Sequence, residues 1–230
     1  MTASGLVLGC TSGLARLAQG RSIMAAASGL ALVGVVAISE KRAALFGAAS
    51  RVLEGEVFGL ILPVALVLAS RRALDPTRLD MAATPLARFG PSRRAVALGL
   101  VMASMIGAAL LAASAAAVAA VLAHDPTAPA VRLDALSCAW IGALGAAAYA
   151  ALFALGATFG SRGAGRWWAL AADFLLGGTS GVGALLAPRA HIQNLLGGEP
   201  PMLLGQPASA ACLFAMAVVF TVLALWRCPP

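Results

Sequence analysis

The chain has 230 residues, of which 61% are hydrophobic and 11% are charged, and its mean hydropathy is +0.92. Soluble domains carry about 45–50% apolar and about 25% charged residues, so this composition excludes an ordinary soluble protein and predicts an integral membrane protein. The net charge of +7 comes from 15 arginines and one lysine against nine acids, and the arginines lie between apolar segments. That placement favours a role in membrane topology over nucleic-acid binding.

Residues 1–22 are mildly amphipathic and predict a helix in the cytoplasmic interface, ahead of the first span. One face of this helix carries Leu6, Cys10, Leu14 and Leu17. The alternative is a secretory signal peptide, with an apolar core over 23–38 and small residues near Ser39. Its basic start would be unusually long, and the rest of the chain already needs a membrane topology, so the interfacial helix is favoured.

Six apolar segments are predicted to cross the membrane as helices, because about 20 apolar residues suffice for a core about 30 Å thick. Their approximate ranges are 23–38, 53–70, 95–123, 135–160, 167–187 and 208–226. They predict an all-α polytopic fold with one transmembrane domain over residues 1–230. Pro63 is expected to kink the second span, and the Gly156–Gly160 spacing predicts close helix packing in the fourth.

The connection over residues 71–94 holds six arginines, two aspartates and three prolines. Asp75-Pro76 is typical of a helix start, and Pro85 is expected to end or bend the helix near Thr84. Helical spacing places Leu79, Ala82, Ala83 and Leu86 on one face. The segment therefore predicts a short amphipathic helix outside the membrane, between the second and third spans.

Two other connections carry polar residues on the opposite side of the membrane. Glu54 and Glu56 lie at the start of the second span, where they form either an outer loop with solvated charges or the charged lining of a pathway mouth. Arg51 and Glu54 are three residues apart and can pair on one helix face. Residues 188–207 form the second long connection, in which 189–196 is predicted to form a short helix before Gly197-Gly198.

The distribution of basic residues predicts the orientation of the chain. With six spans, eleven basic residues fall on the side of the chain ends and five on the other side. Lys and Arg accumulate on the cytoplasmic side of a bilayer. Both termini are therefore expected in the cytoplasm, and the predicted location is the cytoplasmic (inner) membrane of a bacterium.

Asp173 is the one acid that lies well inside a predicted span and not at its start. A carboxylate facing lipid costs about 2.5–3.5 kcal/mol on insertion scales, so Asp173 is expected to face protein or water. One interpretation is an acid that lines a transport pathway. The favoured alternative is an acid near the cytoplasmic boundary that pairs with Arg162 or Arg166.

An intramembrane enzyme is an alternative interpretation of the chain. The stretch Gly178-Thr179-Ser180-Gly181 fits the GxSG pattern of intramembrane serine proteases, but a serine nucleophile needs a histidine within hydrogen-bond reach. His191 is eleven residues away, and like His124 it is expected to be a solvated histidine at a span end. The four scattered cysteines indicate neither a metal site nor a disulfide framework. They are Cys10, Cys138, Cys212 and Cys228.

The order of these elements resembles the permease subunits of type-2 ABC exporters. Before the third span, Thr84-Pro85 and Gly90-Pro91-Ser92-Arg93-Arg94 are similar to the Pro…Ser-Arg segment that such permeases often carry there. The family often has an acidic stretch with Gly-Thr and a further Glu after the second span. This chain has Arg71-Arg72 and Arg78-Leu79-Asp80 instead, which leaves the subfamily and the substrate open.

The resemblance implies that residues 75–89 form a coupling helix that docks on a separate P-loop ATPase. Three apolar side chains would fill a groove on the ATPase and three charged ones would set the register. The apolar set is Leu79, Leu86 and Phe89, and the charged set is Arg78, Asp80 and Arg88. It also implies a homodimer, or a dimer with a related permease, in contact with membrane lipids. Glu54, Glu56 and Asp173 are the pathway candidates.

The chain has no GxxxxGK[ST] motif, and its only lysine is Lys41. A P-loop needs a lysine on the phosphates, so ATP and Mg²⁺ are expected on the partner subunit. For this chain itself the expectation is no catalytic residue, no bound cofactor, no metal and no nucleic-acid partner. A heme-exporter-type permease and a non-transporting membrane scaffold remain open as alternatives, with the serine protease as a remote one.

Overall fold

The computed structural model describes residues 3–43, 47–74, 77–88, 90–125, 130–179 and 181–229, and these residues form helices and turns without a strand. The first half of the chain contains α1 (Ala3–Leu17), α2 (Gly20–Ala43), α3 (Ala48–Ser50), η1 (Arg51–Ile61), α4 (Leu62–Ala73) and α5 (Leu79–Ala87). The second half contains α6 (Arg93–Leu122), α7 (Val131–Gly156), η2 (Ser161–Gly163), α8 (Gly165–Gly177), η3 (Val182–Leu186), α9 (Pro188–Leu195), η4 (Pro201–Leu203) and α10 (Gln206–Trp226). The prediction of an all-helical chain is confirmed for this part of the sequence.

Within the described ranges, five helices are long and apolar enough to cross a membrane, which fits a multi-pass membrane protein. They are α2, the continuous helix Ala48–Ala73, α6, α7 and α10. The first of these is longer than its predicted range of 23–38, because helical structure continues through the polar residues at both ends. The second helix changes from the π-helical winding of η1 to the α-helical winding of α4 between Ile61 and Leu62, one residue before Pro63.

The expected fifth span over 167–187 is not one helix. Helix α8 ends at Gly177 after 13 residues, which give a length of about 20 Å against a membrane core of about 30 Å. Residues 177–183 include four glycines, and glycine is a poor helix former, so α8 does not continue through this stretch. The predicted short helix at 189–196 is present as α9.

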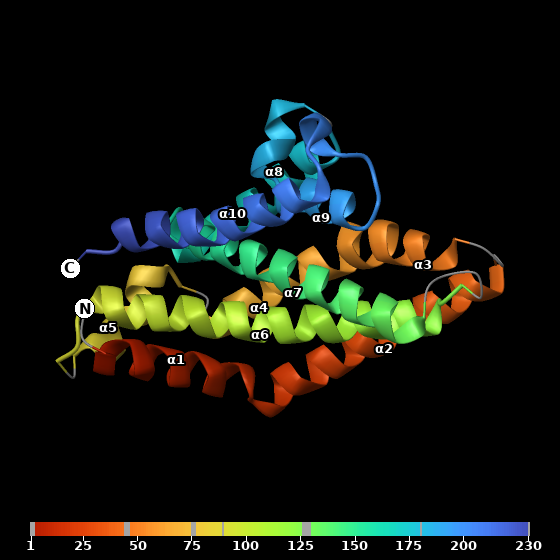
Figure 1. Cartoon of the computed structure of the whole chain (residues 1–230). Helices are drawn as coiled ribbons and strands as arrows, with labels where there is room; N and C mark the ends of the chain where they lie inside the picture. Colours follow the sequence, from red (N-terminus) through yellow and green to blue (C-terminus); the bar gives the residue numbers. More distant parts are fainter. Residues whose placement is uncertain are drawn as a thin grey trace.

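The long helices lie side by side, with α6 and α7 at the centre (Figure 1). The two chain ends and α5 lie at one end of this bundle, while α8 and α9 stand to one side of it (Figure 1). Small residues allow the close approach of α6 and α7. A Cβ on Gly142 would lie only 2.8 Å from the carbonyl oxygen of Ala112, so a larger residue there would separate the two helices.

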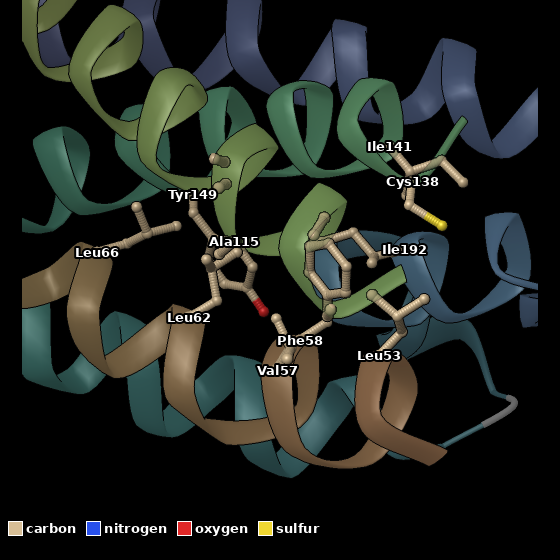
Figure 2. Packing of buried hydrophobic residues seen from close by; sticks show 14 of the residues in the cluster. Leu53, Val57, Phe58, Leu62, Leu66, Ala115, Cys138, Ile141, Tyr149 and Ile192 are labelled. Carbon is tan, nitrogen blue, oxygen red and sulfur yellow. The ribbon is translucent and has the colours of Figure 1, made fainter. Parts of the chain in front are cut away.

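The core on the other side of α7 is built from larger side chains. In Figure 2, Tyr149 of α7 lies over Leu62, and Phe58 of η1 faces Ile192 of α9. All four side chains are at most 2% exposed. Ile192 fits against α7 because position 145 is a glycine, whose missing Cβ would lie 2.5 Å from the Cδ1 of Ile192. The core thus joins α9 to the long helices.

Helix α1 differs from the predicted interfacial helix in the face that it buries. Its buried residues are Gly5, Gly9 and Gly13, whereas Leu6 is exposed. A Cβ on Gly9 would collide with the carbonyl of Val96. A Cβ on Gly99 would collide in the same way with the carbonyl of Leu6. Helix α1 therefore runs in contact along the first half of α6 (Figure 1), with a row of glycines at the closest approach and Leu17 packed beside Gly107.

Candidate functional site

A polar cleft of about 510 Å³ lies at the end of the bundle opposite the chain ends. It contains three acidic and two basic side chains. Its lining residues are Glu40, Ser50, Arg51, Glu54, Gly55, Glu56, Arg189 and Gln193. The structure therefore brings together Glu54 and Glu56, two of the residues that the sequence singled out, with Arg189, which the sequence did not.

The π-helical winding of η1 shapes one wall of this cleft. Glu54 is half-buried and Glu56 is exposed, while Arg51 forms an ion pair of 3.4 Å with Glu40 of α2. A Cβ on Gly59 would lie 3.5 Å from the Nη2 of Arg189, so the glycine leaves room for the arginine beside η1. π-Helical turns are rare and frequently occur at functional sites.

Arg189 connects the cleft to the protein interior. Its guanidinium lies 5.1 Å from the ring centre of Phe174, within the range of a cation–π interaction. Its backbone N–H donates a hydrogen bond of 3.2 Å to the Oδ1 of Asp173. A continuous chain of contacts thus runs from the cleft, through Arg189, to a buried carboxylate on α8.

Asp173 is 2% exposed and is held by two donors. The Tyr149 hydroxyl donates a hydrogen bond of 2.6 Å to Oδ2, and Arg189 donates to Oδ1. The expected pairing with Arg162 or Arg166 is wrong, because the side chain points toward α7 and α9. Arg166 instead donates a hydrogen bond of 2.9 Å to the carbonyl of Thr77.

The position of Asp173 explains how α9 begins. Ala187 occupies the N-cap position of α9 and has no side chain that can accept a hydrogen bond. Asp173 supplies that acceptor from α8, since it bonds to the backbone N–H of the second helical residue. A negative charge at a helix N-terminus is also favoured by the helix dipole.

His191 is fully buried, so the expectation of a solvated histidine is wrong for this residue. Its Nδ1 lies 3.1 Å from the Ser209 hydroxyl, and its Nε2 lies 3.2 Å from the carbonyl oxygen of Leu185. Asn194 donates a hydrogen bond of 2.8 Å to the same hydroxyl. Burial lowers the pKa of His191, in keeping with a neutral ring that donates from Nε2 and accepts at Nδ1.

This network ties α9 to the start of α10 and leaves the histidine fully engaged. Ser180, the nucleophile of the protease interpretation, lies outside the described residues. The sequence did contain a signal for the network, because His191 and Asn194 are three residues apart and share a helical face. Among the residues that the structure describes, no cluster of three or more His, Cys, Asp or Glu side chains is able to hold a metal ion.

The second candidate surface is α5, at the other end of the bundle. Its buried side is formed by Leu79, Ala82 and Ala83, and Leu79 is 0% exposed. These residues pack in a cluster with Val96 and Leu100 of α6. The expectation that Leu79 fills a groove on a partner is therefore wrong, because its side chain belongs to the core of this chain.

The other predicted coupling residues are spread over different environments. Leu86 is half-buried, and Asp80 is half-buried and paired with Arg78 at 3.2 Å. Phe89 and the predicted helix start at Asp75-Pro76 lie outside the described residues. Pro85 lies inside the helix, which continues to Ala87 instead of ending near Thr84.

The outward side of α5, here called the outer face, consists of Arg78, Met81, Pro85 and Arg88. All four are exposed, and Met81 is 61% exposed. Sequence reasoning missed Met81 because it does not belong to the continuous apolar face that begins at Leu79. An exposed methionine between two arginines is a surface that suits an apolar pocket with an acidic rim.

The C-terminal end of the chain is packed beside α5. Arg94 donates a hydrogen bond of 3.1 Å to the carbonyl oxygen of Cys228. Burial raises the pKa of the Cys228 thiol to about 11, and the nearby negative charge of Asp80 acts in the same direction. The thiol is therefore protonated and shielded at neutral pH while α5 and the chain end stay in place.

Comparison of this chain with protein-family models, with curated proteins and with solved structures finds no match. No family, relative or structural neighbour therefore identifies a function. The features of the chain that bear on function are the polar cleft, the buried contacts of Asp173 and the outer face of α5.

Proposed function

We propose that this chain is the membrane-spanning permease subunit of an ATP-driven ABC exporter and that a separate P-loop ATPase drives it. The observation that carries the proposal is the outer face of α5. It presents Arg78, Met81, Pro85 and Arg88 on a short helix outside the candidate spans. A membrane scaffold has no evident need for such a rigid, outward-facing helix.

The attachment of α5 suits the transmission of force. Leu79, Ala82 and Ala83 are buried against α6, so α5 cannot move independently of that helix. Helix α6 is one of the five candidate spans and packs against α1, α2, α4 and α7. A displacement imposed on α5 by an ATPase would therefore be passed to the helices around the pathway.

The polar cleft supports the proposal that this movement drives transport. Charged residues within a membrane bundle are costly and are most often associated with substrate or ion pathways. Glu54, Glu56 and Arg189 line one cleft, and Arg189 connects it to Asp173. The substrate class is left open.

Pairing with a second copy, or with a related permease, is supported by α2. Within the described residues, α2 buries only Val33 and Ala37 against its own chain. Met24 and Val35 are among its exposed apolar side chains. This helix therefore offers a long apolar surface to lipid or to a second permease.

The test replaces residues of the outer face without touching the buried side. The double variant Met81→Asp/Arg88→Glu is expected to reduce recovery of the ATPase and ATP-dependent transport at least about tenfold, because it introduces negative charge where an apolar and basic contact is proposed. Association is measured by affinity purification in mild detergent, and transport in reconstituted vesicles.

The matched control is Met202→Asp, which changes another exposed methionine that lies outside α5. Slow reaction of Cys228 with a maleimide at neutral pH checks that α5 remains seated in the variant. If the double variant binds the ATPase and transports as well as Met202→Asp does, α5 is not the coupling element.

A further inference from the structure

A second cleft, of about 750 Å³, lies where α1 ends and α2 begins. We call it the basic cleft, because three arginines lie among its lining residues. These residues are Arg16, Leu17, Gln19, Ser22, Ala25, Ala26, Ala65, Leu68, Ala69, Arg71, Arg72, Gly107 and Leu111. It involves none of the residues of the polar cleft or of the outer face of α5.

The break between α1 and α2 creates the basic cleft. Helix α1 is held against α6 by its glycines, whereas the first half of α2 diverges from the bundle and buries no residue before Val33 (Figure 1). The opening lies between α2 on one side and α4 on the other. Gly107 of α6 allows Leu17 to form the floor, because a Cβ on that glycine would lie 2.6 Å from the Cδ1 of Leu17.

The charges of the basic cleft are not balanced within it. Arg71 and Arg72 are exposed on the last turn of α4, and Arg16 reaches toward that turn, with its Nη1 3.4 Å from the carbonyl oxygen of Ala73. No acidic side chain lines the cleft, and none of these arginines has an ion pair within the described part of the chain. Three guanidinium groups at one place favour an anionic group, such as a phosphate.

The other half of the basic cleft is apolar. Alanines of α2 and α4 form its two sides, and Leu68 is exposed within it. Apolar walls add nothing to the binding of a small inorganic anion. An acyl chain, in contrast, packs against such walls and buries apolar surface there. The arrangement of a cationic end and an apolar trough matches the arrangement of a phosphate headgroup and its chain.

We propose that the basic cleft binds one anionic phospholipid of the surrounding membrane. The phosphate lies between Arg16, Arg71 and Arg72. One acyl chain runs along Ala25, Leu68 and Leu111. The proposal rests on the membrane location of the chain and not on ATP-driven export, so it stands or falls independently of the proposed function.

Because α1, α2 and α4 all contribute to the basic cleft, the bound lipid holds the break between α1 and α2 at a fixed angle to α4. Helix α4 leads directly toward α5 on one side and into η1 and the polar cleft on the other. Lipid binding is therefore expected to stabilise the fold as a whole and not only one helix end.

The experiment uses the full chain in mild detergent, with phosphatidylglycerol as the anionic probe, phosphatidylcholine as the zwitterionic probe and sodium phosphate as the free anion. Native mass spectrometry counts retained lipids, and a thermal melt reports stabilisation. We expect one tightly retained phosphatidylglycerol and a rise in the melting temperature of several degrees, with no comparable effect of phosphatidylcholine or of phosphate.

Three variants separate a built site from general surface charge. Arg71→Gln/Arg72→Gln is expected to weaken phosphatidylglycerol binding by about tenfold or more. Ala69→Phe keeps every charge but fills the apolar half, and it is expected to weaken lipid binding while leaving the response to phosphate unchanged. Arg21→Gln/Arg93→Gln removes two exposed arginines outside the cleft and is expected to change binding less than twofold.

Several results would overturn the proposal. Equal losses of phosphatidylglycerol binding in the two double variants would mean that lipid binding depends only on the overall charge of the protein. Equal stabilisation by sodium phosphate would indicate a free-anion site, and equal retention of phosphatidylcholine would indicate an apolar groove without headgroup selectivity. An unchanged lipid count in Ala69→Phe, from a preparation that melts cooperatively, would place the lipid elsewhere on the protein.

Discussion

At the scale of single residues, Asp173 determines how the short helices attach to the bundle. Its carboxylate accepts one hydrogen bond from Tyr149 of α7 and one from the backbone of Arg189 at the start of α9. Helices α7, α8 and α9 therefore meet at one side chain. Because Arg189 also lines the polar cleft, Asp173 positions a cleft residue without reaching the cleft itself.

Replacement of Asp173 separates its role as an acceptor from its charge. Asp173→Ala leaves two buried donors without an acceptor, and each such donor costs about 1–3 kcal/mol. Asp173→Asn keeps one oxygen acceptor, so it is expected to melt several degrees above Asp173→Ala in the same detergent. Tyr149→Phe removes only one hydrogen bond, so its melting temperature is expected to be close to that of Asp173→Asn.

The measurement is a thermal melt of the three variants beside the wild type, monitored by circular dichroism. If Asp173→Ala melts at the same temperature as the wild type, the carboxylate does not hold α9 in place.

The sequence singled out Asp173 as an acid that needs a partner but did not show which groups bind it. Asp173 stood out because a carboxylate in an apolar segment needs a partner. Its actual partners lie 24 positions before it and 16 positions after it, so they depend on how α7 and α9 pack. The buried His191–Ser209 pair was missed for a similar reason, since it forms between two separate helices.

At the scale of elements, the contact between α1 and α6 is the clearest case of packing through glycine. The backbones of the two helices touch at Gly9 and Gly99, where neither residue carries a side chain. Close backbone approach of this kind is typical of helix pairs in membranes, where small residues replace hydrophobic burial as the source of association. The row Gly5, Gly9 and Gly13 was present in the sequence as a spacing of four.

Gly9→Leu is expected to displace α1 from α6, because the new side chain would occupy the position of the Val96 carbonyl. Overpacking of this kind costs about 1–3 kcal/mol. We expect a lower melting temperature and faster proteolysis within the first 20 residues. Limited proteolysis followed by mass spectrometry measures the second effect.

The matched control is Gly29→Leu on α2, where a Cβ meets no atom within 4 Å. This substitution is expected to leave the melt unchanged or to raise it slightly, since glycine weakens a helix interior by about 0.5–1 kcal/mol. If Gly9→Leu behaves like Gly29→Leu, the glycine contact does not hold α1 on α6.

Hydropathy predicted the five long helices because each is a continuous apolar run. The same criterion failed for residues 167–187, since it counts glycine as compatible with a span although four glycines there favour a turn. The π-helical winding of η1 depends on tertiary packing and leaves no periodic signal in the sequence. The position of α5 was predicted correctly, but Leu79, which was assigned to a groove on a partner, is buried in the core of this chain.

At the scale of the whole molecule, the two chain ends, α5 and the start of α6 lie together at one end of the bundle (Figure 1). Five candidate spans alone would separate the termini, but α8 and α9 return the chain so that α10 runs back toward that end (Figure 1). Arg93 and Arg94 at the start of α6 and Arg227 after α10 lie at this same end, together with Arg78 and Arg88 of the outer face of α5. This end is where an ATPase is proposed to bind.

The most direct test of the proposed exporter is the composition of the native complex. The wild-type chain would be purified from its own membrane in mild detergent, and quantitative mass spectrometry would give the molar ratio of any P-loop ATPase to this chain. The proposal predicts a ratio close to one, with two copies of each subunit if the permease is a homodimer. A well-folded preparation that contains no P-loop ATPase would contradict it.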